Sequence, residues 1–180
     1  MQQPLKAFPL FKSVDQALSK VYEVLQTSGV KTATYGVPTA ASSSTDKLTK
    51  FDRLTEAAWV TAVVDSVLTP TQRAWVTCTY EGFTNGRNAA IEQLTVLHAG
   101  AHANIDMVRA LVTRHFDFGE TYCKSTTEIG RDTGVSQATA WRTGQKVSRS
   151  IDRLGTEVES ALRAAFIPRG WLNGHGGHAT

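Results

Sequence analysis

Apolar residues recur at intervals of three and four along most of the chain, and no segment shows sustained alternation of apolar and polar residues. Such intervals place side chains on one face of a helix, whereas strict alternation is typical of a strand. The pattern therefore predicts an all-α, multi-helix domain. The expected helices cover residues 13–26, 48–68, 70–82, 89–97 and 105–116, with two further helices after residue 126.

The 180 residues suffice for one well-buried domain, and 41% hydrophobic with 19% charged residues favours a folded chain. Residues 1–47 are expected to form an N-terminal helix or arm and a flexible linker, because residues 28–47 combine Gly, Pro and a Ser/Thr run. Residues 48–172 are expected to form the main helical domain. The Gly-rich residues 173–180 are expected to be a mobile tail.

Two local patterns concern the ends of helices. Thr69 and Gln72 have the spacing of a capping box, and Pro70 occupies the first helical position, where its missing N–H costs nothing. Asn85-Gly86 is a turn signal. We therefore expect a helix to begin at Pro70 and a turn to precede the helix over 89–97.

Tryptophans mark two of the expected apolar faces. Trp59 and Trp75 fall within apolar stripes and are expected to pack in the core. The stripe predicted for the helix over 48–68 consists of Leu54, Ala58, Trp59, Ala62, Val63 and Val67.

The remaining chemistry-bearing residues exclude several classes of protein. Cys78 and Cys123 show no paired spacing, so we expect reduced thiols, and no apolar run reaches the length of a signal peptide or a membrane span. We therefore expect a cytoplasmic protein with no membrane partner. The five histidines lack a companion motif, His175 and His178 included, and no nucleophile elbow, phosphate loop or metalloprotease helix is present. We expect no enzyme, no metal and no cofactor.

Residues 126–154 have the turn and capping residues expected of a helix-turn-helix. Ile129 faces inward, and the small Gly130 allows a second helix to approach closely. Gly134 stands where the chain turns and a positive φ is often needed, Val135 contributes to the core, and Ser136 caps the next helix. The inner stripe of that helix is expected to consist of Ala140, Val147, Ile151, Leu154, Val158 and Leu162.

The second helix of this unit is also where the charge gathers. Residues 136–154 hold four basic residues and one acid, a net charge of +3 that equals the formal charge of the whole chain. In such units the second helix enters the DNA major groove, with base contacts near its N-terminus and phosphate contacts further along. The predicted DNA-binding residues are Ser136, Gln137, Ala138, Thr139, Trp141, Arg142, Lys146, Arg149 and Arg153.

Two alternatives stay open at this point. A helical hairpin with a solvated basic face has much of the same pattern, although Gly130, Gly134 and Ser136 together favour DNA binding. Trp141 either packs on DNA or a partner, or is buried against residues 84–123.

The segment Leu68-Thr69-Pro70-Thr71-Gln72-Arg73 resembles the opening of the region-4 domain of bacterial sigma factors. Residues 127–136 are similar to the helix-turn-helix of that domain, which implies base reading by Gln137, Ala138, Thr139 and Arg142. In sigma factors a short loop joins the two pieces, whereas a helical insertion of about forty residues, 84–123, separates them here.

This layout resembles phage late-gene regulators, including antitermination proteins of the Q type. The resemblance implies binding to double-stranded DNA near a late promoter, and to RNA polymerase and its sigma factor, in the cytoplasm of a bacterial host. The insertion is the expected polymerase-docking element. The alternative is a DNA-packaging protein such as a small terminase subunit, in which the other helices would assemble a ring.

Overall fold

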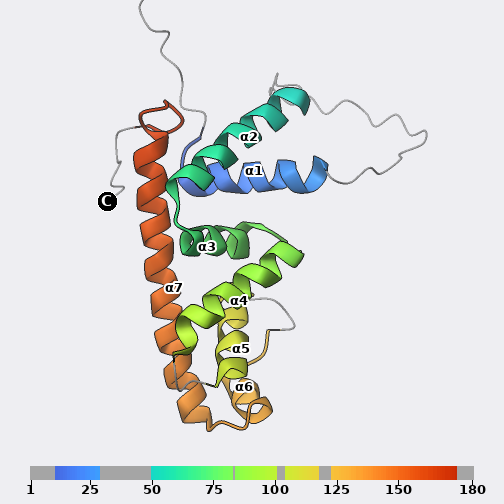
Figure 1. The fold of residues 1–180 in the computed structure, drawn as a ribbon, viewed down its shortest axis with the longest axis vertical. Coiled ribbons are helices and arrows are strands. Elements are labelled where there is room, and N and C mark those ends of the chain that lie inside the picture. The colour runs from blue at the N-terminus through green and yellow to red at the C-terminus, as the bar shows by residue number, and fades with distance from the viewer. Residues whose placement is uncertain (1–10, 29–49, 83, 101–103, 118–122, 174–180) are drawn as a thin grey trace, which may run out of the picture. The chain divides into compact units, whose positions relative to one another are not determined.

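The computed structural model describes residues 11–28, 50–82, 84–100, 104–117 and 123–173, and this part of the chain is all-α (Figure 1). Its helices are α1 (Val14–Ser28), α2 (Lys50–Val67), α3 (Pro70–Tyr80), α4 (Asn85–Ala99), α5 (Ile105–Phe116), α6 (Thr126–Asp132) and α7 (Gln137–Phe166). The predicted linker and nearly all of the predicted tail lie outside the described residues. Within the described part, no helix combines the length and apolar character that crossing a membrane requires.

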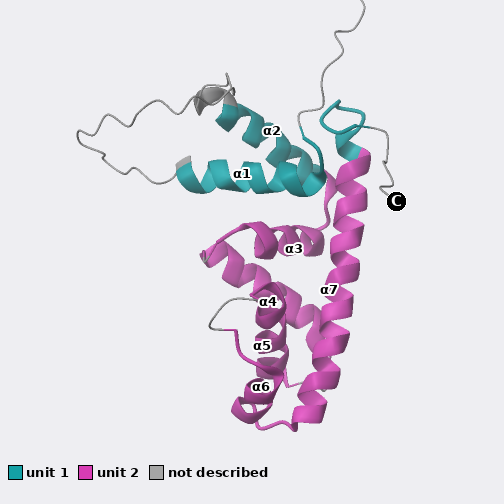
Figure 2. Cartoon of the chain, turned by 180° about the vertical axis from the view of Figure 1, so that it is seen from behind, with its two compact units in different colours: residues 1–66, 165–180 teal, residues 67–164 magenta. Residues whose placement is uncertain are grey.

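The chain divides into two compact units (Figure 2). Unit 1 contains residues 1–66 and 165–180, and unit 2 contains residues 67–164. This division differs from the boundary expected at residue 48, because α2 falls with α1 rather than with the later helices. The helix α7 supplies residues to both units.

In unit 1, the helix predicted over residues 13–26 is present as α1; Val14, Ala17, Leu18 and Val21 of its apolar face are buried, whereas Leu25 near its end is exposed. The helix predicted over residues 48–68 is present as α2, but the apolar face predicted for it is wrong. Its buried residues are Ala57, Val60 and Val64, whereas Trp59 is 64% exposed and Ala58, Ala62 and Val67 are exposed as well. Apolar residues occur on nearly every side of α2, so spacing alone could not select the face that tertiary packing buries.

The predicted start of α3 is confirmed. The Thr69 hydroxyl accepts from the Gln72 backbone N–H, the Gln72 side chain accepts from the Thr69 backbone, and Pro70 is the first helical residue. The turn predicted at Asn85-Gly86 is wrong, because these residues form the first turn of α4. The Thr84 hydroxyl accepts from the Arg87 N–H at 3.0 Å and caps the helix four residues earlier than the apolar pattern indicates.

The core of unit 2 is shared by α3, α4, α5 and α7. Its buried members are Ala74, Cys78, Ala90, Ile91, Leu94, Val108, Val112, Val147 and Ile151. Trp75 packs against this cluster, as predicted, and its indole lies so close to Gly155 that a Cβ there would come within 2.7 Å of the ring. The helices of the expected insertion therefore supply the centre of the unit and are not peripheral to it.

A buried ion pair connects three of these helices. The Arg87 guanidinium of α4 donates to the carboxylate of Asp117, at the C-terminal end of α5, and to the carbonyl of Cys78 on α3. Both charged side chains are less than 10% exposed. Burial raises the pKa of the neighbouring Cys78 thiol to about 12, against the opposing effect of Arg87. We refer to Arg87, Asp117 and the Cys78 carbonyl as the Arg87 clamp.

Candidate nucleic-acid interface

A second apolar cluster joins α6 to α5 and to the start of α7. Met107, Leu111, Ile129 and Ala140 are buried in it, and Val135 packs against it from the turn. The helix α6 begins with a capping box in which the Ser125 hydroxyl accepts from the Glu128 N–H, while the Glu128 carboxylate accepts from the Ser125 backbone. The Glu128 carboxylate accepts from the Ser125 backbone N–H and also from the Ser125 hydroxyl, and these two hydrogen bonds hold its pKa below the ordinary value. The Ser-x-x-Glu spacing is a recognisable signal that the sequence analysis missed.

The turn between α6 and α7 has the predicted geometry. Gly134 has φ of +69°, a conformation that side chains with a Cβ rarely adopt. Gly130 is buried, and a Cβ on it would come within 2.9 Å of the Val135 carbonyl oxygen. The Val135 N–H donates to the Gly130 carbonyl at 2.8 Å. The two glycines therefore allow the second helix to begin directly against the first.

Hydrogen bonds at both ends of α5 fix it to the α6 region. At its start, the Asn104 carboxamide accepts from the Met107 N–H and donates to the Thr133 carbonyl at 3.0 Å. At its end, the Arg114 guanidinium donates to the Lys124 carbonyl at 2.6 Å. The helix α5 thus forms a three-helix group with α6 and the start of α7. Sequence spacing gave no indication that Asn104 has two roles.

The start of α7 is capped as predicted, because the Ser136 hydroxyl accepts from the Thr139 N–H at 3.2 Å. The predicted inner stripe is also confirmed: Leu154 is half-buried, and Ala140, Val147, Ile151, Val158 and Leu162 are buried. The opposite side of the helix is left to solvent.

Four basic side chains occupy that opposite side. Arg142, Lys146, Arg149 and Arg153 are separated by four, three and four residues, and all four are exposed. At 100° per residue they lie within about 40° of Arg142, and the buried Ala140 and Val147 lie about 140–160° away. We refer to these four residues as the basic face. Gln137, Ala138 and Thr139 in the first turn are exposed as well, as is the capping Ser136.

Little of the basic face is neutralised by acidic side chains. Arg153 lies 3.8 Å from the carboxylate of Glu157, and no ion pair joins Arg142, Lys146 or Arg149 to an acidic residue of the described part. The charge therefore faces solvent, where it can attract a polyanion.

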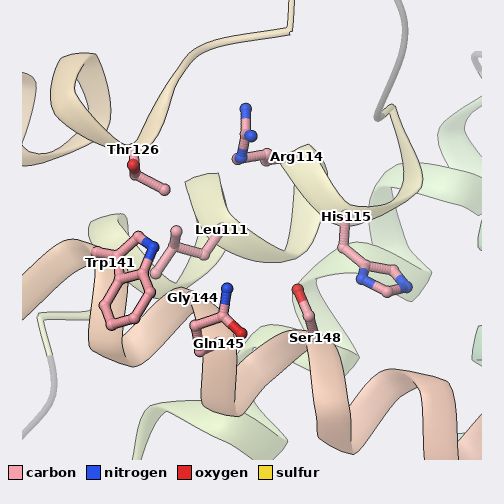
Figure 3. Close-up of a pocket in the computed structure, with 8 residues that line it drawn as sticks. All are labelled: Leu111, Arg114, His115, Thr126, Trp141, Gly144, Gln145 and Ser148. Atoms are coloured by element: carbon pink, nitrogen blue, oxygen red, sulfur yellow. The ribbon is translucent and has the colours of Figure 1, made fainter.

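Trp141 lies beside the basic face and is 55% exposed. It lines a pocket of about 430 Å³ between α5, the start of α6 and α7 (Figure 3). With more than half of its surface exposed, Trp141 is not buried against residues 84–123, and its packing on DNA or a partner stays a prediction.

His98 and His115 interact electrostatically but form no metal site in the described part of the chain. Burial lowers the pKa of His98 on α4 and of His115 on α5, and each is also influenced by a neighbour: His98 by His115, and His115 by Asp152 in the raising direction. The buried Nε2 of His98 has no hydrogen-bond partner in the described part. No cluster of metal-ligating residues occurs there either. His102, His175 and His178 lie outside the described residues.

These contacts define an α-helical unit in which a capped, glycine-hinged turn presents a basic helix. Comparison with known proteins adds no family to this description: no family model matches the chain, and no curated protein or solved structure is significantly similar to it.

Proposed function

We propose that the chain is a sequence-specific double-stranded-DNA-binding transcription regulator and not an enzyme. The observation that carries this proposal is the position of the basic face, directly opposite the buried stripe of α7 and at the helix that follows the turn. A solvated helix needs no such segregation of Arg and Lys from acidic residues. A helix that enters a groove lined by phosphates does.

The proposed roles follow from distance along α7. Gln137, Ala138 and Arg142 lie in its first turns and read base edges, where Gln pairs with adenine, Arg with guanine, and Ala packs on a thymine methyl. Arg149 and Arg153 follow Arg142 by about 10 and 16 Å at 1.5 Å per residue. The major groove is about 12 Å wide, so these two residues reach the phosphates that border it.

The remaining proposed DNA contacts support this arrangement. Lys146 binds phosphate, while Ser136 and Thr139 donate from the start of the helix, where backbone N–H groups also favour anions. Trp141 packs on the sugar backbone beside the bases.

Selection of binding sites from a random duplex pool tests the proposal. The chain should enrich one sequence motif, and the double variant Lys146→Ala/Arg149→Ala should bind it at least tenfold more weakly, since two phosphate contacts are lost. Lys12→Ala/Lys20→Ala removes the same charge from exposed positions of unit 1 and is the matched control. If no motif is enriched, or if both double variants lose the same affinity for the motif, α7 is not the helix that reads the DNA sequence.

We further propose antitermination through RNA polymerase and its sigma factor in the host cytoplasm, a role supported by the resemblance to phage late-gene regulators. Val96 and Leu97 of α4 are 67% and 56% exposed, and Ile105 of α5 is 45% exposed. Exposed apolar side chains are typical of protein contacts.

Polymerase capture tests this second part. Val96→Asp/Leu97→Asp should reduce polymerase pull-down and read-through of a terminator downstream of a late promoter, with DNA affinity retained. Gln93→Asp on the same helix is the control. Unchanged capture and read-through would exclude this surface. Arg109 and Arg114 are unsuitable for such a test, because Arg109 joins Glu92 to Asp106 and Arg114 holds the Lys124 carbonyl.

A further inference from the structure

The pocket beside α7 borders the basic face. Its volume of about 430 Å³ lies within the range of small-molecule pockets, roughly 300–1,000 Å³. The helix α7 lines it with Trp141, Gln145 and Ser148, among others, and α5 with the start of α6 supplies the opposite wall (Figure 3). At 100° per residue, Gln145 lies about 60° from Arg142 around the helix axis, and Trp141 and Ser148 lie about 100° and 120° from it in the same direction. The pocket and the basic face are therefore neighbours on α7.

The wall that α7 contributes combines an aromatic face with polar groups that have no partner. Trp141 is 55% exposed, so much of its indole is accessible. The side chains of Gln145 and Ser148 line the pocket, and neither makes a hydrogen bond to another residue of the described part. An amide and a hydroxyl are therefore available to donate to a ligand and to accept from it.

The lining favours a neutral ligand over a charged one. Arg114 also lines the pocket, but its guanidinium holds the Lys124 carbonyl, and no lining residue is acidic. His115 is mostly neutral at pH 7, because burial lowers its pKa. An anionic group attached to the ligand would instead lie outside the pocket, on the basic face, where little of the charge is neutralised.

A nucleotide within a strand has this division, because a flat neutral base is joined to anionic phosphates. We propose that the pocket receives one unpaired base of the DNA bound to α7, with the base stacked on Trp141 and its polar edge toward Gln145 and Ser148. Unpaired strands are commonly bound by aromatic side chains beside a cationic surface, and every base has a face that can stack. On fully paired DNA, Trp141 reaches only the sugar backbone. This role rests on the proposed binding of DNA by α7 and adds to it a preference for DNA with an unpaired position.

Three short duplexes of one sequence test this role with the full chain. One is fully paired, one carries an unpaired thymidine at its centre, and one carries an abasic nucleotide at the same place. The two bulged duplexes have the same charge and differ only in the base. Fluorescence anisotropy should give the thymidine bulge an affinity higher than that of the abasic bulge by about fivefold or more, because one stacked base is gained.

The three duplexes also separate this role from the proposed function. Equal affinity for the two bulges, with the paired duplex bound, would overturn the role of the pocket and leave DNA binding by α7 in place. If none of the three duplexes is bound, both proposals fail.

Substitution of two exposed tryptophans locates the stacking. Trp141→Leu should make the affinities for the two bulges equal, while the affinity for the paired duplex stays within about threefold. Trp59→Leu changes another exposed indole, in unit 1, and should leave the preference for the thymidine bulge unchanged. Trp141→Phe keeps an aromatic face and should retain most of the preference. An undiminished preference in Trp141→Leu would contradict stacking on this residue.

Filling the pocket without changing Trp141 tests its part in binding the base. Ser148→Met should lower the preference for the thymidine bulge to about twofold or less, because the larger side chain occupies the space of the base. Ser160→Met adds the same side chain at an exposed position of α7 outside the lining and is the control. Thermal unfolding of each variant separates loss of the fold from loss of the site. If folded Ser148→Met keeps the full preference, the base does not enter the pocket and the proposal is wrong.

Discussion

The Arg87 clamp and the basic face both depend on arginine, but they place it in opposite environments. Arg87 is buried and paired with Asp117, and it connects α3, α4 and α5. Arg142 and Arg149 are exposed, and no acidic residue of the described part pairs with them. A buried cation must be neutralised where it stands, whereas an exposed one remains available to a partner. The first kind of charge therefore contributes to folding, whereas the second is accessible for the proposed contacts with DNA.

The largest expected change in stability comes from substitution of Asp117, the ion-pair partner of Arg87. Asp117→Asn removes the carboxylate that is paired with the buried guanidinium and should lower the free energy of unfolding by about 3–5 kcal/mol. Urea denaturation followed by circular dichroism measures it. Asp106→Asn makes the same chemical change at a residue whose side chain is 72% exposed, and should cost no more than about 0.5 kcal/mol. Similar losses of unfolding free energy for both variants would show that buried and exposed ion pairs contribute equally to stability here.

Gly130→Ala tests the junction on which the basic face depends. Its new Cβ would meet the Val135 carbonyl oxygen at 2.9 Å, so the turn must shift, at a cost of about 1–3 kcal/mol in stability. DNA affinity should fall further than stability alone explains, because α7 would be displaced. Gly82→Ala, with no atom within 4 Å of the added Cβ, is the control. Unchanged DNA affinity in a folded Gly130→Ala protein would contradict the proposed role of the turn.

The histidines predict a dependence of stability on pH. Burial lowers the pKa of His98 and His115 in the folded protein below the ordinary value near 6.5. The unfolded chain therefore takes up protons first, and stability should decrease as pH falls below about 6.5. His98→Met removes one of these groups without breaking a hydrogen bond of Nε2, and should flatten the slope. A slope that is unchanged in this variant would exclude His98 as its source.

Arg149 and Arg153 should show the smallest effects, and these should be unequal. Arg149→Ala should reduce the slope of log affinity against log salt by about one, with equal loss on specific and random DNA, because it removes one phosphate contact. Arg153→Ala should reduce the slope less, because Glu157 already lies 3.8 Å from its guanidinium. Binding isotherms at several salt concentrations measure both. A larger change of the salt slope for Arg153→Ala than for Arg149→Ala would contradict the partial neutralisation of Arg153 by Glu157.

Local sequence signals predicted much of the α6–α7 region. Gly134, Ser136 and the inner stripe of α7 occupy the predicted positions, because each depends on contacts within a few residues or on one sharply divided helix. The same reasoning failed for α2. Apolar residues surround that helix, and the buried face was selected by tertiary packing that spacing does not encode.

Long-range polar contacts could not be predicted. Arg87 and Asp117 are thirty residues apart, and the Asn104 carboxamide reaches Thr133 across twenty-nine. Each of these side chains would be equally acceptable on the surface of a helix. The role of Arg87 and Asp117 follows only from the close packing of α3, α4 and α5, which also makes the expected insertion part of the core, and the role of Asn104 follows from the packing of α5 against α6.

The most direct test of the account is the discrimination lost at one base pair when Arg142 is changed. On the selected site, Arg142→Ala should cost about 1–3 kcal/mol and relax the preference at a single position. Arg142→Lys keeps the charge without the bidentate fork, and should lose most of the same discrimination while it retains affinity for random DNA. Equal losses by Arg142→Ala on the selected site and on random DNA, with the base preference intact, would contradict base reading by α7.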